Sequence, residues 1–178
     1  MNIFERPIAL LDFETTGEEA GYHEIVEIGL IVFDQATFDI IHTYECKVRP
    51  HFPGRMSERA KRISPYNEEE WKSALTLKEA LKPLVRMMKD SILCAHNTTF
   101  ENGFLDAALK ETGISIDMDY HAIDIPSLAY GLLKRKGLAS LNMGEIAKFF
   151  GISEEPIPHR AINGAKVEYE FFKKLMTV

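Results

Sequence analysis

The chain has 178 residues, of which 46% are hydrophobic and 27% charged, and its formal net charge is −6. This balance is typical of a globular protein with one proper core, so we expect a single domain over residues 1–178. A membrane span is excluded because no apolar run reaches about 18 residues, and the first residues lack the order of a secretory signal. The negative charge argues against a broad basic face that binds nucleic acid, but it is compatible with phosphate binding through bound cations.

The two cysteines, Cys46 and Cys94, lie in apolar, strand-like stretches. Their separation matches no metal-ligand spacing, which argues against a zinc site. Buried free thiols are favoured over a disulfide, and they predict a reducing, cytoplasmic location.

The first half of the chain is rich in predicted strands. A continuous apolar run over residues 8–13 is typical of a strand that is buried on both faces. Two segments rich in β-branched residues, 25–33 and 40–48, are joined by a short polar link and predict a hairpin. A helix is expected over residues 77–89, where Thr76 and Glu79 have capping-box spacing.

The second half alternates strands with helices. Strands are expected over residues 92–95 and 120–124, and helices over 100–112, 126–136, 141–150 and 160–176. Glycines follow three of these helices, as is usual at helix ends. A strand meander followed by alternating helices and strands predicts an α/β fold, with a mixed sheet of about five strands and flanking helices.

An acidic pair ends the first predicted strand. Asp12 and Glu14 follow a wholly apolar run and are two residues apart, so they project from the same face of the strand. Two hard oxygen ligands side by side suit Mg²⁺ or Mn²⁺. The next residues, Thr15, Thr16 and Gly17, would offer hydroxyls and exposed backbone N–H groups to a nucleotide. The alternative is an exposed strand end with solvated charges.

Two further motifs follow in chain order. Residues 94–105, CAHNTTFENGFL, place polar groups where a strand passes into a helix, and residues 158–165, PHRAINGA, begin the last helix. Together with DFETTG over residues 12–17, they resemble the motifs of the DEDDh 3′–5′ exonucleases, which have an RNase H-like fold. The resemblance covers nearly the whole chain.

The resemblance implies a chemistry. In this family four acidic residues hold two divalent ions, which clamp the attacking and leaving oxygens of a phosphodiester. Asp12 and Glu14 match the first two acids. His159 matches the general base that activates water, a role that suits imidazole. Asn97 and Phe100 match positions near the substrate. The implied reaction releases nucleoside 5′-monophosphates from the 3′ end of single-stranded DNA or RNA.

Two positions depart from the family pattern. Glu101 stands where an aspartate is usual; it could reach a metal directly or through water, or it could pair with Thr98 as a capping box. Gly164 stands where the fourth aspartate is usual and offers no ligand at all. Glu168 lies one turn further on the same helix face, about 6 Å along the axis, which makes direct replacement doubtful.

These departures leave two functional hypotheses open. One is an active, metal-dependent exonuclease with weakened catalysis. The other is an inactive module that kept the exonuclease fold and binds nucleic acid or a protein. A basic run also has two interpretations. Its residues, Arg55, Arg59, Lys61 and Arg62, form either a solvated helix face or a rim that contacts phosphates.

Overall fold

The computed structural model describes residues 2–153 and 157–178 and contains one five-stranded mixed sheet. The strand order is β3-β2-β1-β4-β5. β1 pairs antiparallel with β2 and parallel with β4. On the outer sides, β2 pairs antiparallel with β3, and β4 pairs parallel with β5. The mixed sheet expected from the sequence is confirmed. The strands are β1 (Ile8–Thr15), β2 (Ile25–Phe33), β3 (Ile40–Lys47), β4 (Ile92–Ala95) and β5 (Ala122–Asp124).

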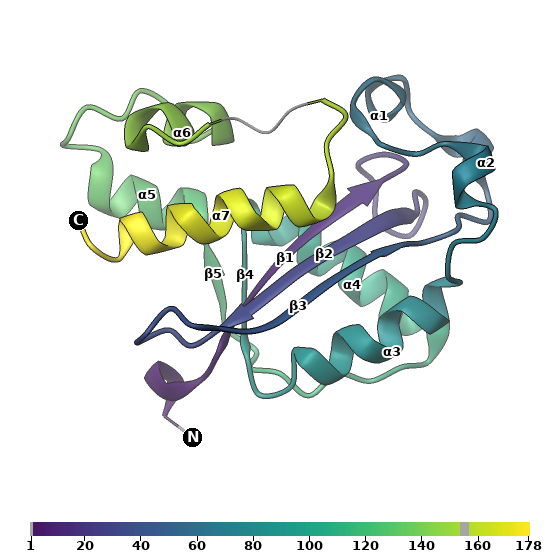
Figure 1. The fold of residues 1–178 in the computed structure, drawn as a ribbon, viewed down its shortest axis with the longest axis horizontal. Coiled ribbons are helices and arrows are strands. Elements are labelled where there is room, and N and C mark those ends of the chain that lie inside the picture. The colour runs from purple at the N-terminus through teal and green to yellow at the C-terminus, as the bar shows by residue number, and fades with distance from the viewer. Residues whose placement is uncertain (1, 154–156) are drawn as a thin grey trace.

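Helices cover both faces of the sheet (Figure 1). One face carries α3 (Leu77–Met87) and α4 (Thr98–Thr112). The other carries α5 (Ile125–Leu133), α6 (Met143–Phe150) and α7 (Ala161–Leu175). Two short helices, α1 (Glu58–Ile63) and α2 (Glu68–Trp71), lie beyond the C-terminal end of β1. Single 3-10 turns, η1 (Ile3–Glu5) and η2 (Pro53–Arg55), complete the described elements.

The apolar run of β1 supplies both cores. Ile8 and Leu10 pack under α5–α7, whereas Ala9 and Leu11 pack under α3 and α4. Successive side chains of a strand point to opposite faces, so a strand buried on both sides must be apolar throughout. The same alternation directs Asp12 toward the face that α7 covers. Among the described residues, no helix has the length and apolar character needed to cross a membrane.

Several element ends differ from the sequence prediction by a few residues. β5 begins at Ala122, after Tyr120, whose side chain is 90% exposed and has no core to join. α6 begins after Asn142, because the Asn142 side chain accepts a hydrogen bond from Glu145 N and caps the helix. α5 ends at Leu133, its last buried residue, short of residue 136. α4 begins two residues early, at Thr98.

The start of α7 is anchored on β2 by a buried charge. Glu27 is fully buried, and its carboxylate accepts hydrogen bonds from Arg160 Nε at 2.9 and 3.1 Å. It also accepts the backbone N–H of Ala161, the first residue of α7, at 3.0 Å. An anion at a helix N-terminus is favoured by the helix dipole. Next to it, Gly29 lets the α7 backbone lie directly on β2, since a Cβ there would overlap Ala161.

We predict that Gly29→Ala lowers the free energy of unfolding by about 1–3 kcal/mol or more, because the added methyl would overlap the backbone of Ala161 and Ile162 in α7. The matched control is Gly131→Ala in α5, where a Cβ would have no neighbour within 4 Å. That change should raise stability by about 0.5–1 kcal/mol, as for alanine over glycine in a helix. Urea denaturation measures both. Equal effects of the two substitutions would contradict the close packing of α7 on β2.

Candidate functional site

The acidic pair lies where β1 passes under α7. Asp12 and Glu14 are both half-buried. Across the β1–β2 ladder, Asp12 pairs with Gly29 and Glu14 pairs with Glu27. Directly opposed residues of an antiparallel pair share a face, so both carboxylates project toward the α7 side, as the spacing predicted. Since Glu27 is bound by Arg160, the start of α7 and the acidic pair are neighbours on one side of the sheet.

Glu101 comes to the same place from α4. Its side chain is only 4% exposed, and its Oε2 has no hydrogen-bond partner within the described residues. Burial, and then the nearby Asp12 carboxylate, raise the pKa of Glu101 to about 9. The capping-box alternative is wrong, because α4 has Asn97 as its N-cap and Thr98 N donates instead to Asp124 Oδ1 at 3.1 Å. A buried, incompletely satisfied carboxylate beside a second one is costly unless a cation joins them.

Gly164 faces Asp12 directly. A Cβ built on Gly164 would lie 2.5 Å from Oδ2 and 2.9 Å from Cγ of Asp12. The position that is normally a fourth acid therefore does lie next to the first acid, although here it carries no side chain. One turn further along α7, Glu168 is 1% exposed, so it belongs to the buried face of the helix.

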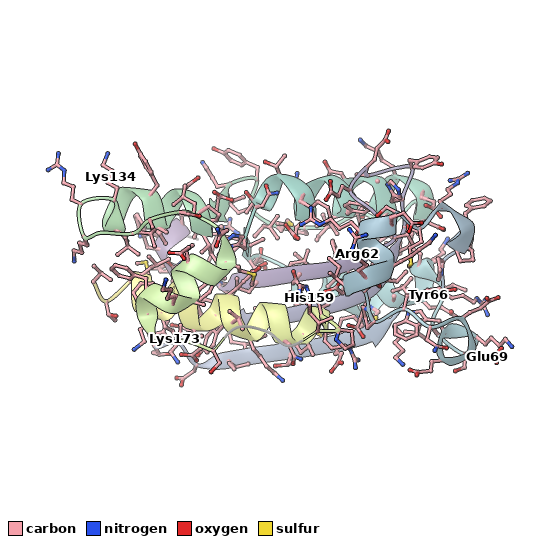
Figure 2. The ribbon with its side chains drawn as sticks, turned by 90° about the horizontal axis from the view of Figure 1, so that it is seen from above. Arg62, Tyr66, Glu69, Lys134, His159 and Lys173 are labelled. Atoms are coloured by element: carbon pink, nitrogen blue, oxygen red, sulfur yellow. The ribbon has the colours of Figure 1, made fainter. Side chains whose placement is uncertain are left out.

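His159 is held between two helices. It directly precedes Arg160, the N-cap residue of α7, and its backbone N–H donates to Ile63 O at the end of α1 at 2.9 Å. Figure 2 shows it at this junction, next to Arg62 of α1. At the other end of α1, Ser57 N donates to Thr16 O at 2.8 Å. The short helix α1 therefore links the turn after the acidic pair to His159.

The turn after β1 is more closed than the sequence indicated. Thr16 is fully buried, and its hydroxyl accepts a hydrogen bond from Glu24 N at 2.9 Å. The Thr15 hydroxyl donates to Gly17 O at 2.6 Å. Gly17 is itself buried, with the His23 ring where a Cβ would stand. The expectation that this turn offers hydroxyls and exposed N–H groups to a nucleotide therefore needs correction for the two threonines: both hydroxyls bind within the turn, and the Thr16 N–H donates to Glu24 O at 2.8 Å.

Asn97 and Phe100 lie at the start of α4. Asn97 is exposed and has a left-handed backbone, with φ of 80°, while the half-buried Phe100 ring stacks on Phe104 at 4.8 Å between centroids. Asp124 was not singled out from the sequence. Its two oxygens accept backbone N–H groups from Thr98 and Ser127, so it joins the starts of α4 and α5. The sequence did carry a signal for this role: an aspartate two residues before a proline is typical of a helix N-cap.

The basic run divides into three parts. Arg59 and Lys61 form ion pairs with Glu18 and Glu58, as a solvated helix face would. Arg62 is exposed at the end of α1, one residue before the carbonyl that binds His159. Arg55 instead stacks on aromatic rings.

An aromatic cleft borders the turn. Arg55 Cζ lies 4.9 Å from the Tyr22 ring centroid and 4.0 Å from that of Phe52. Tyr22 and Phe52 are 48% and 52% exposed, and they line a cleft of about 600 Å³ that also includes His23. The cleft thus adjoins Gly17 through the His23 ring. No spacing rule marks these aromatics, which are 30 residues apart in sequence and meet only in the fold.

The donor set suits a hard cation. Asp12, Glu14 and Glu101 are carboxylates on neighbouring elements, and the lone Oε2 of Glu101 is the kind of buried atom that a cation would satisfy. Over residues 2–153 and 157–178, no three such side chains are already arranged around one point. The carboxylates would therefore have to close on an ion as it binds.

Comparison with known proteins agrees with this architecture. A family model described as an exonuclease, RNase_T, matches residues 10–172. The PolC-type DNA polymerase III of Thermotoga maritima is 29% identical over 94% of this chain, and that of Staphylococcus saprophyticus is 28% identical over 94%. The chain spans only 12% and 11% of the length of these two relatives.

Solved structures show the same fold at low sequence identity. The nuclease domain of 3′hExo, a DEDDh family member bound to rAMP, has a TM-score of 0.77 at 18% identity, with 99% of this chain and 94% of that chain covered. Escherichia coli ExoI in complex with single-stranded DNA also has a TM-score of 0.77, at 14% identity, over 97% of this chain and 43% of that one. The RNase H-like exonuclease fold implied by the motifs is confirmed. The chain has the fold of 3′hExo, a DEDDh family member, as its motifs predicted. Because the family model matches nearly the whole chain, the protein belongs to the RNase_T exonuclease family.

Proposed function

We propose that this protein is a divalent-cation-dependent nuclease that removes nucleoside 5′-monophosphates from the 3′ end of single-stranded nucleic acid. The observation that carries the proposal is the buried Glu101 Oε2, which lacks a hydrogen-bond partner in the described residues and lies beside Asp12. An isolated buried carboxylate is unfavourable in the free chain, and a bound cation would remove that cost. Membership of an exonuclease family supports the reaction class.

Asp12, Glu14 and Glu101 would hold the cation, either Mg²⁺ or Mn²⁺. When bound, such an ion stabilises the negative charge that develops on a phosphate during hydrolysis. The chain's own contribution is to fix these carboxylates on rigid elements, since β1 and α4 each pack in the core. Mn²⁺ should serve better than Mg²⁺, because Mg²⁺ demands near-ideal octahedral geometry and this ligand set is altered.

His159 would accept the proton of the attacking water. Its backbone N–H is bound by Ile63 O on one side, and the start of α7 follows it on the other, so its backbone is held beside the helix whose next turn meets Asp12. This support is what a general base needs, because proton transfer depends on hydrogen-bond geometry.

The aromatic cleft suits a single strand. Unpaired bases stack on exposed aromatic rings, and an arginine beside them attracts the phosphates. Tyr22, Phe52 and Arg55 provide these groups next to the turn that follows the acidic pair. The single-stranded DNA of the ExoI complex and the rAMP of the 3′hExo structure are consistent with such a ligand. Asn97 and Phe100 at the start of α4 stay proposed contacts to the terminal nucleotide.

We also propose that residues 1–178 act as one domain in the cytoplasm. Helices on both faces share one sheet, and Cys46 and Cys94 are free thiols, as a reducing compartment favours.

The proposal is tested with single-stranded DNA and RNA oligonucleotides labelled at either end, incubated with Mn²⁺ or with EDTA. The 3′ label should be released first as a mononucleotide, and the 5′-labelled strand should shorten stepwise. EDTA and Asp12→Asn should both abolish cleavage. Loss of the 5′ label first would contradict the direction.

The second candidate function is a binding module without catalysis, which Gly164 favours because it removes one carboxylate from the site. Oligonucleotide binding without any cleavage in Mn²⁺, by a folded chain, would establish this alternative and reject the nuclease.

We predict that His159→Ala lowers kcat by about 100-fold, the usual scale of general-base catalysis, and changes KM little. His42→Ala is the control, since His42 is exposed on β3. Steady-state kinetics on a fluorescent single-stranded substrate measures both. A His159→Ala enzyme with the kcat of the wild type would show that another group takes the proton.

We predict that replacing Tyr22 and Phe52 by alanine weakens binding of an oligonucleotide of about ten nucleotides by at least tenfold, since each base stack contributes about 1–3 kcal/mol. Binding of a dinucleotide should not change. Phe4→Ala is the control, because Phe4 is 76% exposed in η1, before the start of β1. Fluorescence anisotropy with Mn²⁺, in a His159→Ala background that slows cleavage, measures affinity while the cation site is filled. An equal loss for both lengths would place the rings at the terminal nucleotide instead of along the strand.

A further inference from the structure

Gly164 is the point at which α7 lies directly against the Asp12 carboxylate. Gly164 is buried there, and a glycine inside a helix costs roughly 1 kcal/mol relative to alanine. Helix stability therefore does not explain the glycine. A side chain at this position would force the Asp12 carboxylate aside, so glycine lets Asp12 lie against the helix but supplies no ligand of its own.

Glu168 is the acidic side chain of α7 that follows this contact on the same face of the helix. It is four residues after Gly164, on the same face of α7, and 1% exposed. Side chains of an α-helix lean toward the helix N-terminus, so the Glu168 side chain leans toward Gly164. The buried face of α7 consists mainly of alanine, isoleucine and phenylalanine. Burying a glutamate among them is costly unless its carboxylate has a polar or ionic partner.

The Glu168 carboxylate also lies near the floor of the site. Burial first, and then the neighbouring Glu168, raise the pKa of the Cys94 thiol. Cys94 of β4 pairs with Leu10 of β1, and Asp12 is the next β1 residue on that face. One such step along a strand is roughly 7 Å, so Glu168 is about one residue pair below Asp12 and leans toward it.

We propose that Glu168 replaces the carboxylate missing at residue 164 and, together with Asp12, holds a second divalent cation. This inference rests on the proposed function, in which Asp12, Glu14 and Glu101 hold the first. The unpartnered, buried Oε2 of Glu101 beside Asp12 is the independent sign that cations belong in this cluster. The longer glutamate spans the extra helical turn, and Gly164 lets Asp12 lie against the helix on the same face.

The test counts bound ions in the full chain by equilibrium dialysis against Mn²⁺ and by calorimetric titration. The wild type should bind two equivalents, and Glu168→Gln should bind one. Glu170→Gln on the same helix is the control and should bind two, since Glu170 forms an ion pair with Lys173 on the half-exposed side.

Each result separates this inference from the function on which it rests. Two equivalents retained by Glu168→Gln, or a single equivalent in the wild type, would overturn the role of Glu168 while leaving the first site intact. No Mn²⁺ bound by the wild type would instead reject the proposed function itself. If Glu168→Gln does not fold, Glu168→Asp keeps the charge and shortens the reach; it should weaken the second binding step at least tenfold, and unchanged titration would overturn the proposal.

Discussion

The buried carboxylate of Glu27 is the contact on which the arrangement of the site depends. It has no solvent exposure, and it binds both the guanidinium of Arg160 and the first N–H of α7. A buried charge that loses its partner is strongly destabilising, so this contact holds α7 on β2 in a single register. Arg160 also donates to Glu45 of β3 at 3.0 Å, which extends the anchor across two strands.

That register decides what meets at the end of β1. With Ala161 over Gly29, the next turn of α7 brings Gly164 to Asp12, and the residue before Arg160 is His159. On the opposite side, α4 delivers Glu101 to the same carboxylate. The proposed site residues on β1 and at the start of α7 are thus held together by one ion pair and one close backbone contact, with α1 linking the turn after β1 to His159.

Much of this could be derived from residue patterns. The apolar run before Asp12 predicted a strand buried on both faces, and the D-x-E spacing predicted a shared face for Asp12 and Glu14. Element existence followed from periodicity, whereas element ends depended on single contacts such as the Asn142 cap. The motif order predicted the exonuclease fold, and the family match confirms it.

Other features could not be derived because they depend on contacts between distant segments. The spacing of Glu101 allowed two interpretations, contact with a metal or a capping box with Thr98. The capping box is rejected only by the structure, in which Glu101 is buried beside Asp12 and Asn97 is the N-cap of α4. The threonine hydroxyls were expected to be available to a nucleotide, but Glu24, where the chain returns, binds both the hydroxyl and the N–H of Thr16. Glu27 and Gly29 did carry signals: a charge and a glycine inside an apolar strand imply a buried partner and a close backbone approach.

The carboxylates beneath the start of α7 are proposed to form a cation site, and anomalous X-ray scattering can locate the ion itself. Crystals of the protein would be grown with Mn²⁺ and a nucleoside 5′-monophosphate. We expect a manganese peak within coordination distance of both Asp12 and Glu101, with the phosphate of the nucleotide on the open side of the ion. Crystals that bind the nucleotide at saturating Mn²⁺ but show no manganese peak at Asp12 would contradict it.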